Sequence, residues 1–479
     1  MADDKVTINF EGKELTCRSG TSVAVALWEN GIRHLSRSPK YGRPRGLTCA
    51  RGHCTACLMR VDGVPNVRTC ETPVREGLRV ERQDPGAVYA PLLQKSLELG
   101  DAIFPVGFYY KWFTRPAVLS RFFLGRIRPL TGVGRLPDAD AAAGTAAGTA
   151  AGEAPRPEDL GRYRTVIVGA GPSGLAAAAA TASADAPVLL LDDHLQPGGQ
   201  RRAALAAVAG AEGQPLDRFP LLQRAHTRLQ DLLARVAAMP HVEFRGGWRA
   251  VAGYAPDGLV LGDGSRLATV RADRLIWTAG ALDTLGRFAG NDTPGVLGPR
   301  ALYRLLTRDG LELSGRRVLV VGGGLDLWLS ACLLAAGGAC LGLVVTESGW
   351  QSEVSAAVDR RWQLTTGLQL TEIKPHGPEG IEAIFTPESD QPGPLESHLR
   401  LQADLAVVCG RGKPVYDIPY QLGADLVLRP DAGGYVPRDP RDATGRGEAA
   451  GSLSLRIRGE ADGTLPHERV MARREEETA

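Results

Sequence analysis

The sequence has 479 residues, of which 43% are hydrophobic and 23% are charged, and its formal net charge at pH 7 is +2. This length and composition are typical of a globular chain with two or three domain cores rather than of a disordered one. A charge so close to zero gives no electrostatic basis for binding nucleic acid, which requires a strongly basic face.

The N-terminal segment and the cysteines indicate the cellular compartment of the protein. The segment MADDKVTINF has neither a basic stretch nor an apolar run that would predict a signal peptide, and no run of about eighteen apolar residues predicts a transmembrane segment. We therefore expect a cytoplasmic protein. Four cysteines lie between Cys49 and Cys70, and in a reducing compartment such a cluster indicates a metal site rather than disulfides.

The N-terminal part predicts a small ferredoxin-like β-grasp domain. Residues 5–15 alternate apolar and polar side chains around Glu11 and Gly12, which predicts a β-hairpin, and residues 22–32 predict a helix. A cysteine-containing loop and further short strands follow. We expect this domain to span residues 1–90.

The cysteines of this loop predict an iron–sulfur cluster. Cys49, Cys54, Cys57 and Cys70 have the spacing C-x4-C-x2-C-x12-C, in which one loop supplies three thiolates and a later segment supplies the fourth. Four thiolates in that arrangement fit a [2Fe–2S] cluster, and Gly52 lets backbone N–H groups approach the sulfurs. The alternatives are a zinc site, which more often has two C-x2-C pairs, and thiol exchange at Cys54 and Cys57.

Residues 91–160 form a connector of unusual composition. Its segment 104–130 holds five of the ten phenylalanines together with Trp112, and residues 137–159 are an alanine- and glycine-rich linker. The aromatic area must be covered, either by the domains of this chain, by a second subunit or by a membrane surface.

Residues 161–479 predict an α/β flavoprotein domain with two dinucleotide-binding units. One β-α-β unit covers residues 165–193 and a second covers 316–347, so the second unit, at about 315–410, is nested within the first. The fold class is therefore mixed: an α+β ferredoxin-like domain followed by a Rossmann-like α/β domain. No C-x-x-C motif occurs in residues 161–479, which disfavours dithiol chemistry there.

The first dinucleotide motif lies between a predicted strand and a predicted helix. Gly169, Gly171 and Gly174 form the pattern G-x-G-x-x-G directly after the strand TVIV. The first glycine permits the turn, the second allows a pyrophosphate to approach the backbone, and the third allows the helix to pack closely on the strand. A purely structural turn is the alternative.

Further residues of the first site follow the next strand. Asp192 or Asp193 ends that strand, where a carboxylate can bind ribose hydroxyls, and the sequence does not choose between them. Gly198 and Gly199 continue the pattern as a second glycine pair near the pyrophosphate. A second glycine pair is typical of flavoproteins, so the expected ligand is FAD.

The second motif is weaker. Gly322 and Gly324 follow the strand VLVV, but Leu327 occupies the third glycine position. Glu347 ends the next strand and would favour NAD over NADP. The two interpretations left open are an NAD site and a site that has lost its ligand but kept its architecture.

No group of side chains for oxidising a substrate is recognisable, so the catalytic residues stay unknown. The histidines are dispersed, and none lies in a recognisable acid–base pair. They are His34, His53, His194, His226, His241, His376, His398 and His467.

Several motifs in one order resemble a known family. The ferredoxin-like domain is accompanied by RSPKYGRPRG at 37–46, PNVR at 65–68, GFYYKWF at 107–113 and FAGNDTPGVL at 288–297, with GAGPSG between the last two. Together they resemble the α subunit of heterotetrameric sarcosine oxidase over essentially the whole chain. Opine oxidases, hydroxyproline dehydrogenases and hydrogen cyanide synthase are related assemblies.

The resemblance implies an electron-transfer subunit. In such families a separate FAD-dependent β subunit, similar to amino acid oxidases, oxidises a small amine or imino acid, and further small subunits can be present. The cluster cysteines place this chain nearer the opine oxidase and cyanide synthase side. Because the sequence printed here has no aminomethyltransferase-like part, we expect no tetrahydrofolate coupling. Glu460 stands where the fold has an FAD-contacting aspartate, and related α subunits can hold NAD instead.

Two other functions stay open at this point. One is a self-contained NAD(P)H-dependent flavin and iron–sulfur reductase that uses the second nucleotide site. The other is a scaffold without enzymatic activity.

Overall fold

The computed structural model describes residues 5–38, 43–83, 156–211, 216, 219–254, 258–345, 363–387, 399–410, 412–429, 434–438 and 454–458. The predicted aromatic connector and most of the linker lie outside these residues, as do Trp112, Glu347 and Glu460. Among the described residues, no helix combines the length and the apolar character that crossing a membrane requires.

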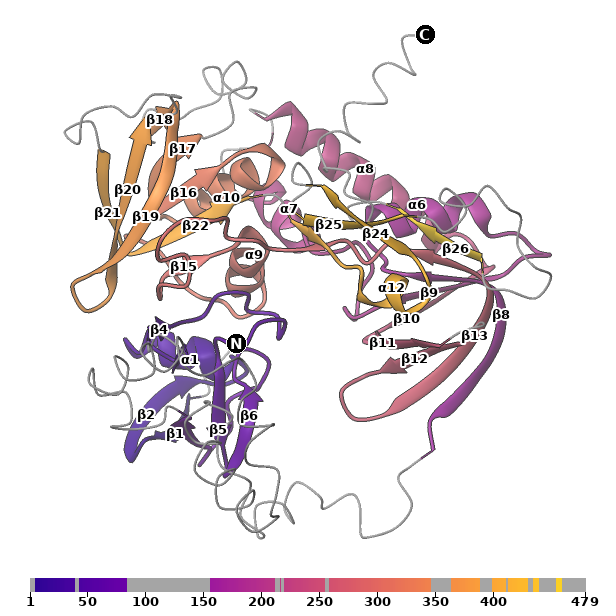
Figure 1. The fold of residues 1–479 in the computed structure, drawn as a ribbon, viewed down its shortest axis with the longest axis horizontal. Helices are drawn as coiled ribbons and strands as arrows, with labels where there is room; N and C mark the ends of the chain where they lie inside the picture. The colour runs from indigo at the N-terminus through magenta and orange to yellow at the C-terminus, as the bar shows by residue number, and fades with distance from the viewer. Residues whose placement is uncertain are drawn as a thin grey trace, which may run out of the picture.

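The N-terminal domain is a five-stranded sheet with one helix against it (Figure 1). The strands have the order β2(Lys13–Arg18), β1(Lys5–Phe10), β7(Arg79–Arg82), β5(Leu58–Val61) and β6(Val64–Arg68). Glu11 and Gly12 turn the β1–β2 hairpin with φ of 51° and 87°. Helix α1(Val23–Glu29) begins at Ser22, whose hydroxyl accepts a hydrogen bond from the backbone N of Val25, and its residues 23–28 are buried. A short ladder of β3(Ser36–Arg37) and β4(Pro44–Arg45) precedes the cysteine loop.

The first nucleotide-binding unit is a seven-stranded sheet. Its strands are β10(Val242–Gly246), β9(Val188–Asp192), β8(Glu158–Val168), β13(Leu267–Trp277), β12(Gly258–Gly262) and β11(Arg249–Tyr254), with β26(Ser454–Ile457) also paired to β13. Strands β10, β9, β8, β13 and β26 are parallel, whereas β11, β12 and β13 are antiparallel. Helices α6(Pro172–Thr181), α7(Arg202–Ala209) and α8(Pro220–Ala237) accompany this sheet (Figure 1).

The second unit is inserted between β13 and β26. Its parallel sheet has the order β15(Val296–Leu297), β22(Leu405–Cys409), β16(Arg317–Gly322), β17(Cys340–Val345) and β18(Gln363–Thr366), with helices α9(Pro299–Thr307) and α10(Gly324–Ala336). An antiparallel sheet of β19(Leu368–His376), β20(Gly380–Pro387) and β21(Leu399–Ala403) packs beside it. The chain returns through β23(Lys413–Pro414), which pairs with β14(Ala281–Leu282), then α12(Asp417–Gln421) and the hairpin of β24(Asp425–Arg429) and β25(Gly434–Arg438). The first sheet is therefore completed by a strand that follows the second unit in the chain.

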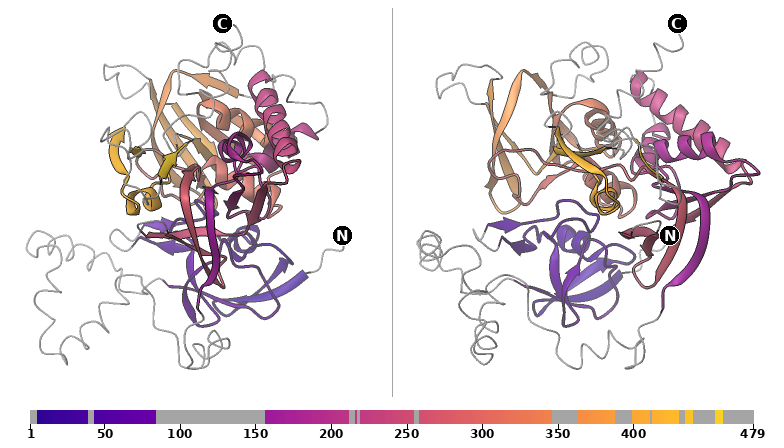
Figure 2. Two further views of the ribbon diagram at one scale, coloured as in Figure 1. Left: turned by 90° about the vertical axis from the view of Figure 1, so that its right-hand side faces the viewer. Right: turned by 45° about the vertical axis from the view of Figure 1, so that its right-hand side comes forward.

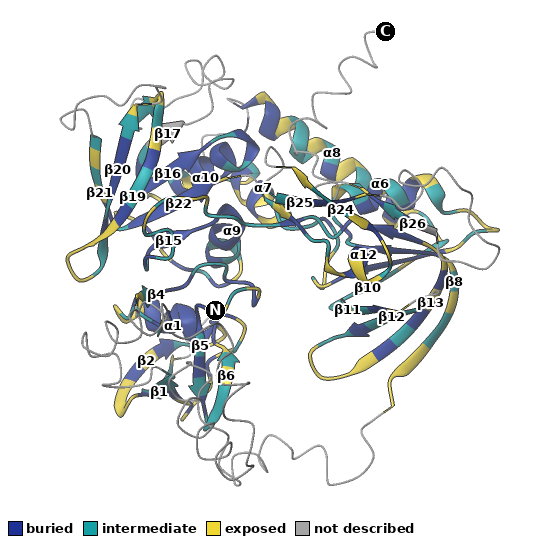
Figure 3. Cartoon of the chain, viewed as in Figure 1, coloured by how far each residue is buried: buried dark blue, intermediate teal, exposed yellow. Residues whose placement is uncertain are grey.

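Burial follows this layout (Figure 3). Most of α10 is buried, including Leu327, which is fully covered, and a continuous group of buried apolar side chains runs from the N-terminal domain into both nucleotide-binding units. A core shared in this way fixes the three parts relative to one another.

The N-terminal domain docks against the second unit, below α9 and β15 (Figures 1 and 2). Arg33, whose side chain is 8% exposed, forms an ion pair with Glu379 at 3.2 Å. Arg43 and Arg45 both reach Asp292, at 3.6 and 3.8 Å. These charges join segments far apart in the sequence and position the cysteine loop toward the nucleotide-binding units.

Candidate cluster and nucleotide site

The four cysteines of the predicted cluster converge, with Cys49, Cys54 and Cys57 in the loop before β5 and Cys70 just after β6. The Cys49 thiol interacts with the thiols of Cys54 and Cys70, and the Cys70 thiol interacts with that of Cys57. Hydrogen bonding from Cys54, followed by that from Cys70, lowers the pKa of Cys49 despite its burial, and the bond with Cys70 lowers the pKa of Cys57 to about 7. All eight cysteines of the chain are free thiols.

Backbone N–H groups surround these sulfurs. The N–H groups of Arg51 and Cys54 both donate to Cys49 Sγ at 3.4 Å, and that of Gly52 donates to Cys70 Sγ at 3.3 Å. Gly52 has φ of +70°, and a Cβ at this position would overlap the Glu71 carboxylate. Four converging thiols surrounded by amide donors fit a [2Fe–2S] cluster, whose sulfurs are stabilised by such bonds.

The predicted glycine motif lies between β8 and α6. A Cβ at Gly169 would overlap the carbonyl of Thr278, and one at Gly174 would overlap the carbonyl oxygen of Gly169. At Gly171, by contrast, the nearest atom to an added Cβ would be Gly199 Cα, at 3.8 Å. The first and third glycines are thus required by the fold, whereas the space beside the second is left open for a ligand.

A cavity of about 540 Å³ opens over this motif, a volume typical of sites for small molecules and cofactors. Gly198 has φ of +121°, and its N–H donates to Ala170 O at 2.7 Å, which brings the second glycine pair against the first motif. The buried Oε1 of Gln200 has no hydrogen-bond partner in the described part of the chain, so it is a free acceptor in the wall. The wall includes Gly169, Gly171, Asp192, Asp193, His194, Gly198, Gly199, Gln200, Trp248 and Ile418.

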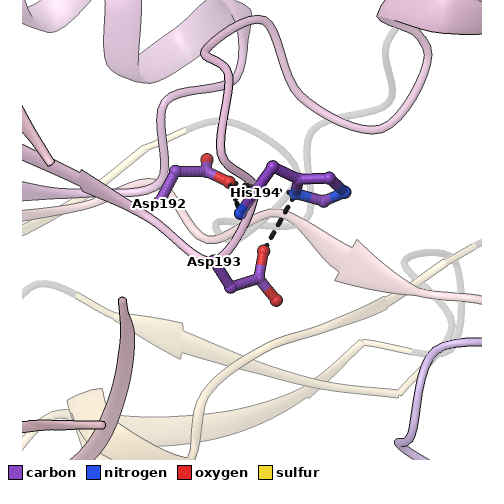
Figure 4. Close-up of side chains that lie close together, drawn as sticks. All are labelled: Asp192, Asp193 and His194. Atoms are coloured by element: carbon purple, nitrogen blue, oxygen red, sulfur yellow. Dashed lines mark hydrogen bonds and ion pairs between the residues drawn. The ribbon is translucent and has the colours of Figure 1, made fainter. Parts of the chain in front are cut away.

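Both predicted ribose-binding acids line this cavity, and a histidine joins them (Figure 4). His194 Nδ1 lies 3.0 Å from Asp192 Oδ1 and 2.9 Å from Asp193 Oδ1. The other oxygen of Asp192 accepts a hydrogen bond of 2.6 Å from the backbone N–H of Ala170. The interpretation that no histidine belongs to an acid–base pair was wrong for His194, because it directly follows the two acids and its ring folds back onto them.

The aspartates favour the protonated imidazole. Hydrogen bonding from Asp192, and then from Asp193, raises the pKa of His194 to about 9 against the opposing effect of burial. Burial also opposes ionisation of Asp193, but His194, Arg51 and Arg249 outweigh it and lower the pKa of that carboxyl. His194 and Asp193 thus both stay ionised at neutral pH.

Replacing His194 with Gln is expected to reduce stability in a pH-dependent way. Because the folded pKa of about 9 lies above the ordinary 6.5, the stabilisation is complete below about pH 6.5 and is lost as pH rises through 9. The side chain is 41% exposed, so solvent screening limits the effect to about 1 kcal/mol or less. Unfolding curves of both proteins from pH 6 to 10 measure it; an equal difference at both ends would contradict the assignment, and His376→Gln is the exposed control.

The cysteine loop forms part of the cavity wall. Arg51 and His53, which lie between Cys49 and Cys54, both line the cavity. The Arg51 side chain is 9% exposed, and its Nη2 lies 3.4 Å from His194 Nε2 and 3.9 Å from Asp193 Oδ1. The cluster site and the nucleotide cavity are therefore adjacent.

The second motif leads to a different arrangement. Gly322 ends β16 and Gly324 is the first residue of α10. Within the described residues neither glycine lines the cavity, although the next residue, Leu325, does. Asp326, in the first turn of α10, accepts two hydrogen bonds of 2.6 Å from Arg201. The start of this helix is thus occupied by the protein's own ion pair.

That ion pair belongs to a buried network. Tyr303 Oη donates to Asp326 at 2.9 Å, and Arg300, 3.9 Å from Asp326, pairs with Asp283 at 2.7 Å. Burial opposes ionisation of Asp326, but Arg201 and Arg300 outweigh it and lower the pKa of its carboxyl. Charges balanced in this way hold α7, α9 and α10 together.

Two parts of the chain match known domain families. Residues 3–85 match the model of the 2Fe-2S iron-sulfur cluster binding domain, and residues 167–220 match that of the NAD(P)-binding Rossmann-like domain. The sarcosine oxidase subunit alpha of Rhizobium meliloti is 26% identical over 444 residues, which cover 88% of this chain and 41% of the relative. The hydrogen cyanide synthase subunit HcnA of Pseudomonas aeruginosa is 37% identical over 78 residues, which cover 16% of this chain and 74% of the relative.

The chain belongs to the family of sarcosine oxidase α subunits, opine oxidases and hydrogen cyanide synthase. It has the family's cluster-binding domain followed by its nucleotide-binding fold. The sequence spans about two fifths of the length of the sarcosine oxidase subunit of Rhizobium meliloti. Among solved structures, the L-proline dehydrogenase of P. horikoshii has a similar fold, with a TM-score of 0.58 and 18% identity over 99% of this chain and 75% of that one.

Proposed function

We propose that this chain is the electron-transfer subunit of a heteromeric dehydrogenase or oxidase of amines or imino acids. The observation that carries the proposal is the shared wall: Arg51 and His53 of the cysteine loop line the nucleotide cavity. Two redox sites so close together suit a relay better than two independent functions.

In this proposal each group of residues has one task. Cys49, Cys54, Cys57 and Cys70 bind the cluster, and the glycine motif with Gly198 and Gly199 accepts the pyrophosphate of FAD, or of NAD, at the first site. When bound, the nucleotide cofactor supplies electron-pair chemistry and the cluster supplies one-electron transfer. Asp192 and Asp193 are available to the ribose.

The second nucleotide unit has an architectural role in this proposal. The helix N-terminus that would receive a pyrophosphate is instead occupied by the ion pair of Asp326 with Arg201. This arrangement disfavours the self-contained reductase, which would need NAD(P)H at that site.

We further propose that the substrate is bound elsewhere. His194 is ion-paired with Asp192 and Asp193, and its raised pKa of about 9 keeps it protonated, so it is not a base for removing a proton from an amine. A FAD-dependent, amino acid oxidase-like partner subunit would oxidise a sarcosine-, opine- or hydroxyproline-type substrate and pass the electrons on. The free cysteines suit a cytoplasmic location.

Metal and sulfide content test the first part of the proposal. Purified without oxygen, the protein is expected to hold about two irons and two inorganic sulfides per chain, because four thiolates complete one such cluster. Cys57→Ser should deplete the iron, whereas the same change at the buried Cys332, outside the loop, should leave it in place. Stoichiometric zinc without sulfide would contradict the cluster assignment.

Reconstitution tests the second part. The chain alone should not oxidise sarcosine, proline or an opine, but the chain mixed with its flavin-containing partner should pass electrons from one of them to an artificial acceptor. If the aromatic connector forms the interface, Trp112→Ala should weaken association by about 2 kcal/mol, as central aromatic anchors do. Rapid amine oxidation by the isolated chain would refute the proposal, and rapid NADH oxidation would favour the reductase.

A further inference from the structure

One residue of the cysteine loop contacts both redox sites. The backbone N–H of Arg51 donates to Cys49 Sγ at 3.4 Å, while its side chain reaches His194 at 3.4 Å and Asp193 at 3.9 Å. The side chain is 9% exposed, so its charge acts in a region from which most water is excluded. Moving this guanidinium therefore changes the electrostatic potential at both the cluster site and the nucleotide cavity.

A second pair of charged residues, Glu71 and Arg249, connects the same two sites. Glu71 directly follows Cys70, and Arg249, on the cavity wall, lies 3.8 Å from Glu71 and 3.5 Å from Asp193. Asp193 is thus approached by one arginine from the cluster domain and one from the nucleotide-binding unit. The ionic contacts between the two domains therefore converge on Asp193, one of the two carboxylates proposed to bind the ribose.

We propose that Arg51 is a positioning residue that couples the nucleotide cavity to the cluster: the occupancy of the cavity depends on Arg51, and the potential of the cluster depends on Asp193. The inference rests on the proposed function, since it requires a cluster on the four cysteines and a nucleotide at the first site. Coupling between two sites is reciprocal, so each site must respond to a change made at the other.

The expected signs follow from charge. A reduced cluster carries one more negative charge than an oxidised one, so removing the Arg51 cation disfavours reduction and lowers the midpoint potential. Removing the Asp193 anion has the opposite effect and raises it. Because Asp193 faces the cysteine loop through Arg51 and also through Arg249, its effect should become smaller once Arg51 has been replaced.

The test compares Arg51→Gln, Asp193→Asn and the double variant of the full chain, purified anaerobically. Nucleotide released by heat is quantified per chain, and the cluster potential is measured by an EPR-monitored reductive titration with dithionite. Arg79→Gln and Asp273→Asn are matched controls, because Arg79 and Asp273 form ion pairs at the surface with Glu81 and Arg162.

We expect Arg51→Gln to keep its iron but to retain less than a third of the wild-type nucleotide. Its ratio of reduced to oxidised cluster at a fixed potential should fall at least threefold, which is about 28 mV at 59 mV per tenfold change. Asp193→Asn should shift the ratio at least threefold in the opposite direction, and the double variant should differ from Arg51→Gln by a smaller factor than Asp193→Asn differs from the wild type. The controls should match the wild type.

Two results overturn the inference. One is wild-type nucleotide retention in Arg51→Gln, and the other is an unchanged potential in Asp193→Asn. If Arg51→Gln loses iron, Asp193→Asn decides alone, because its side chain contacts no cysteine of the loop within the described contacts. A wild-type protein without sulfide or without nucleotide refutes the proposed function instead.

Discussion

Gly171→Val is expected to weaken nucleotide retention about 100-fold while the protein stays folded. Apart from the adjoining residues, the nearest atom to an added Cβ at this position is Gly199 Cα, at 3.8 Å, so the fold has room for a side chain to begin here. The side chain would instead fill the space over the glycine motif that a pyrophosphate must enter, and forcing extra atoms into such a space costs up to about 3 kcal/mol. Nucleotide released by heat, quantified per chain, measures the loss.

A substitution at Gly174, the third glycine of the motif, is expected to affect the fold rather than the ligand. At Gly174 even a methyl group would overlap the carbonyl oxygen of Gly169, so Gly174→Ala should lower the stability of the protein itself. Circular dichroism and unfolding curves separate the two variants. Normal nucleotide content in a folded Gly171→Val protein would show that the ligand does not approach this loop.

Asp326→Ala is expected to destabilise the protein by about 3 to 5 kcal/mol, since it leaves buried guanidinium groups without their shared anion. Arg201 loses two hydrogen bonds of 2.6 Å, and Tyr303 loses its 2.9 Å bond. The free energy of unfolding in urea measures the effect.

Two further variants test this prediction. Asp425→Ala removes an exposed carboxylate at the start of β24 and should change stability by no more than about 0.5 kcal/mol. Replacing Arg201 and Asp326 together by Met and Leu removes both charges at once, so it should be less harmful than Asp326→Ala alone. Equal stability of Asp326→Ala and the wild type would mean that the network does not hold the helices together.

The sequence was most informative where the chemistry is local. The cysteine spacing and the glycine motif each lie within about twenty residues, so their geometry follows from turns and strand ends that residue type dictates. The contacts that join the sites are not local. Arg51 and His194 are 143 residues apart, and Arg201 and Asp326 are 125 apart, so only the folded chain reveals these pairs.

His194 is an intermediate case. The run Asp192, Asp193, His194 contained the signal for a charged cluster, but adjacent residues at the end of a strand usually point in different directions. It was the turn after β9 that brought the three side chains together. For the second site, the missing third glycine predicted weakness, whereas the occupation of the helix start by Arg201 and Asp326 could not be predicted from spacing.

The place of β26 in the first sheet has a consequence for synthesis on the ribosome. Residues 274–277 of β13 pair with β8 on one side and with β26 on the other, yet β26 follows roughly 180 residues later in the chain. At about 5 to 20 residues per second, the ribosome needs about 10 to 35 s after β13 to reach β26, and until then this edge of β13 is unpaired. An unpaired apolar edge invites association between nascent chains, so slower growth at low temperature and added chaperones should raise the soluble yield more for this protein than for one whose sheet is complete before an insertion begins.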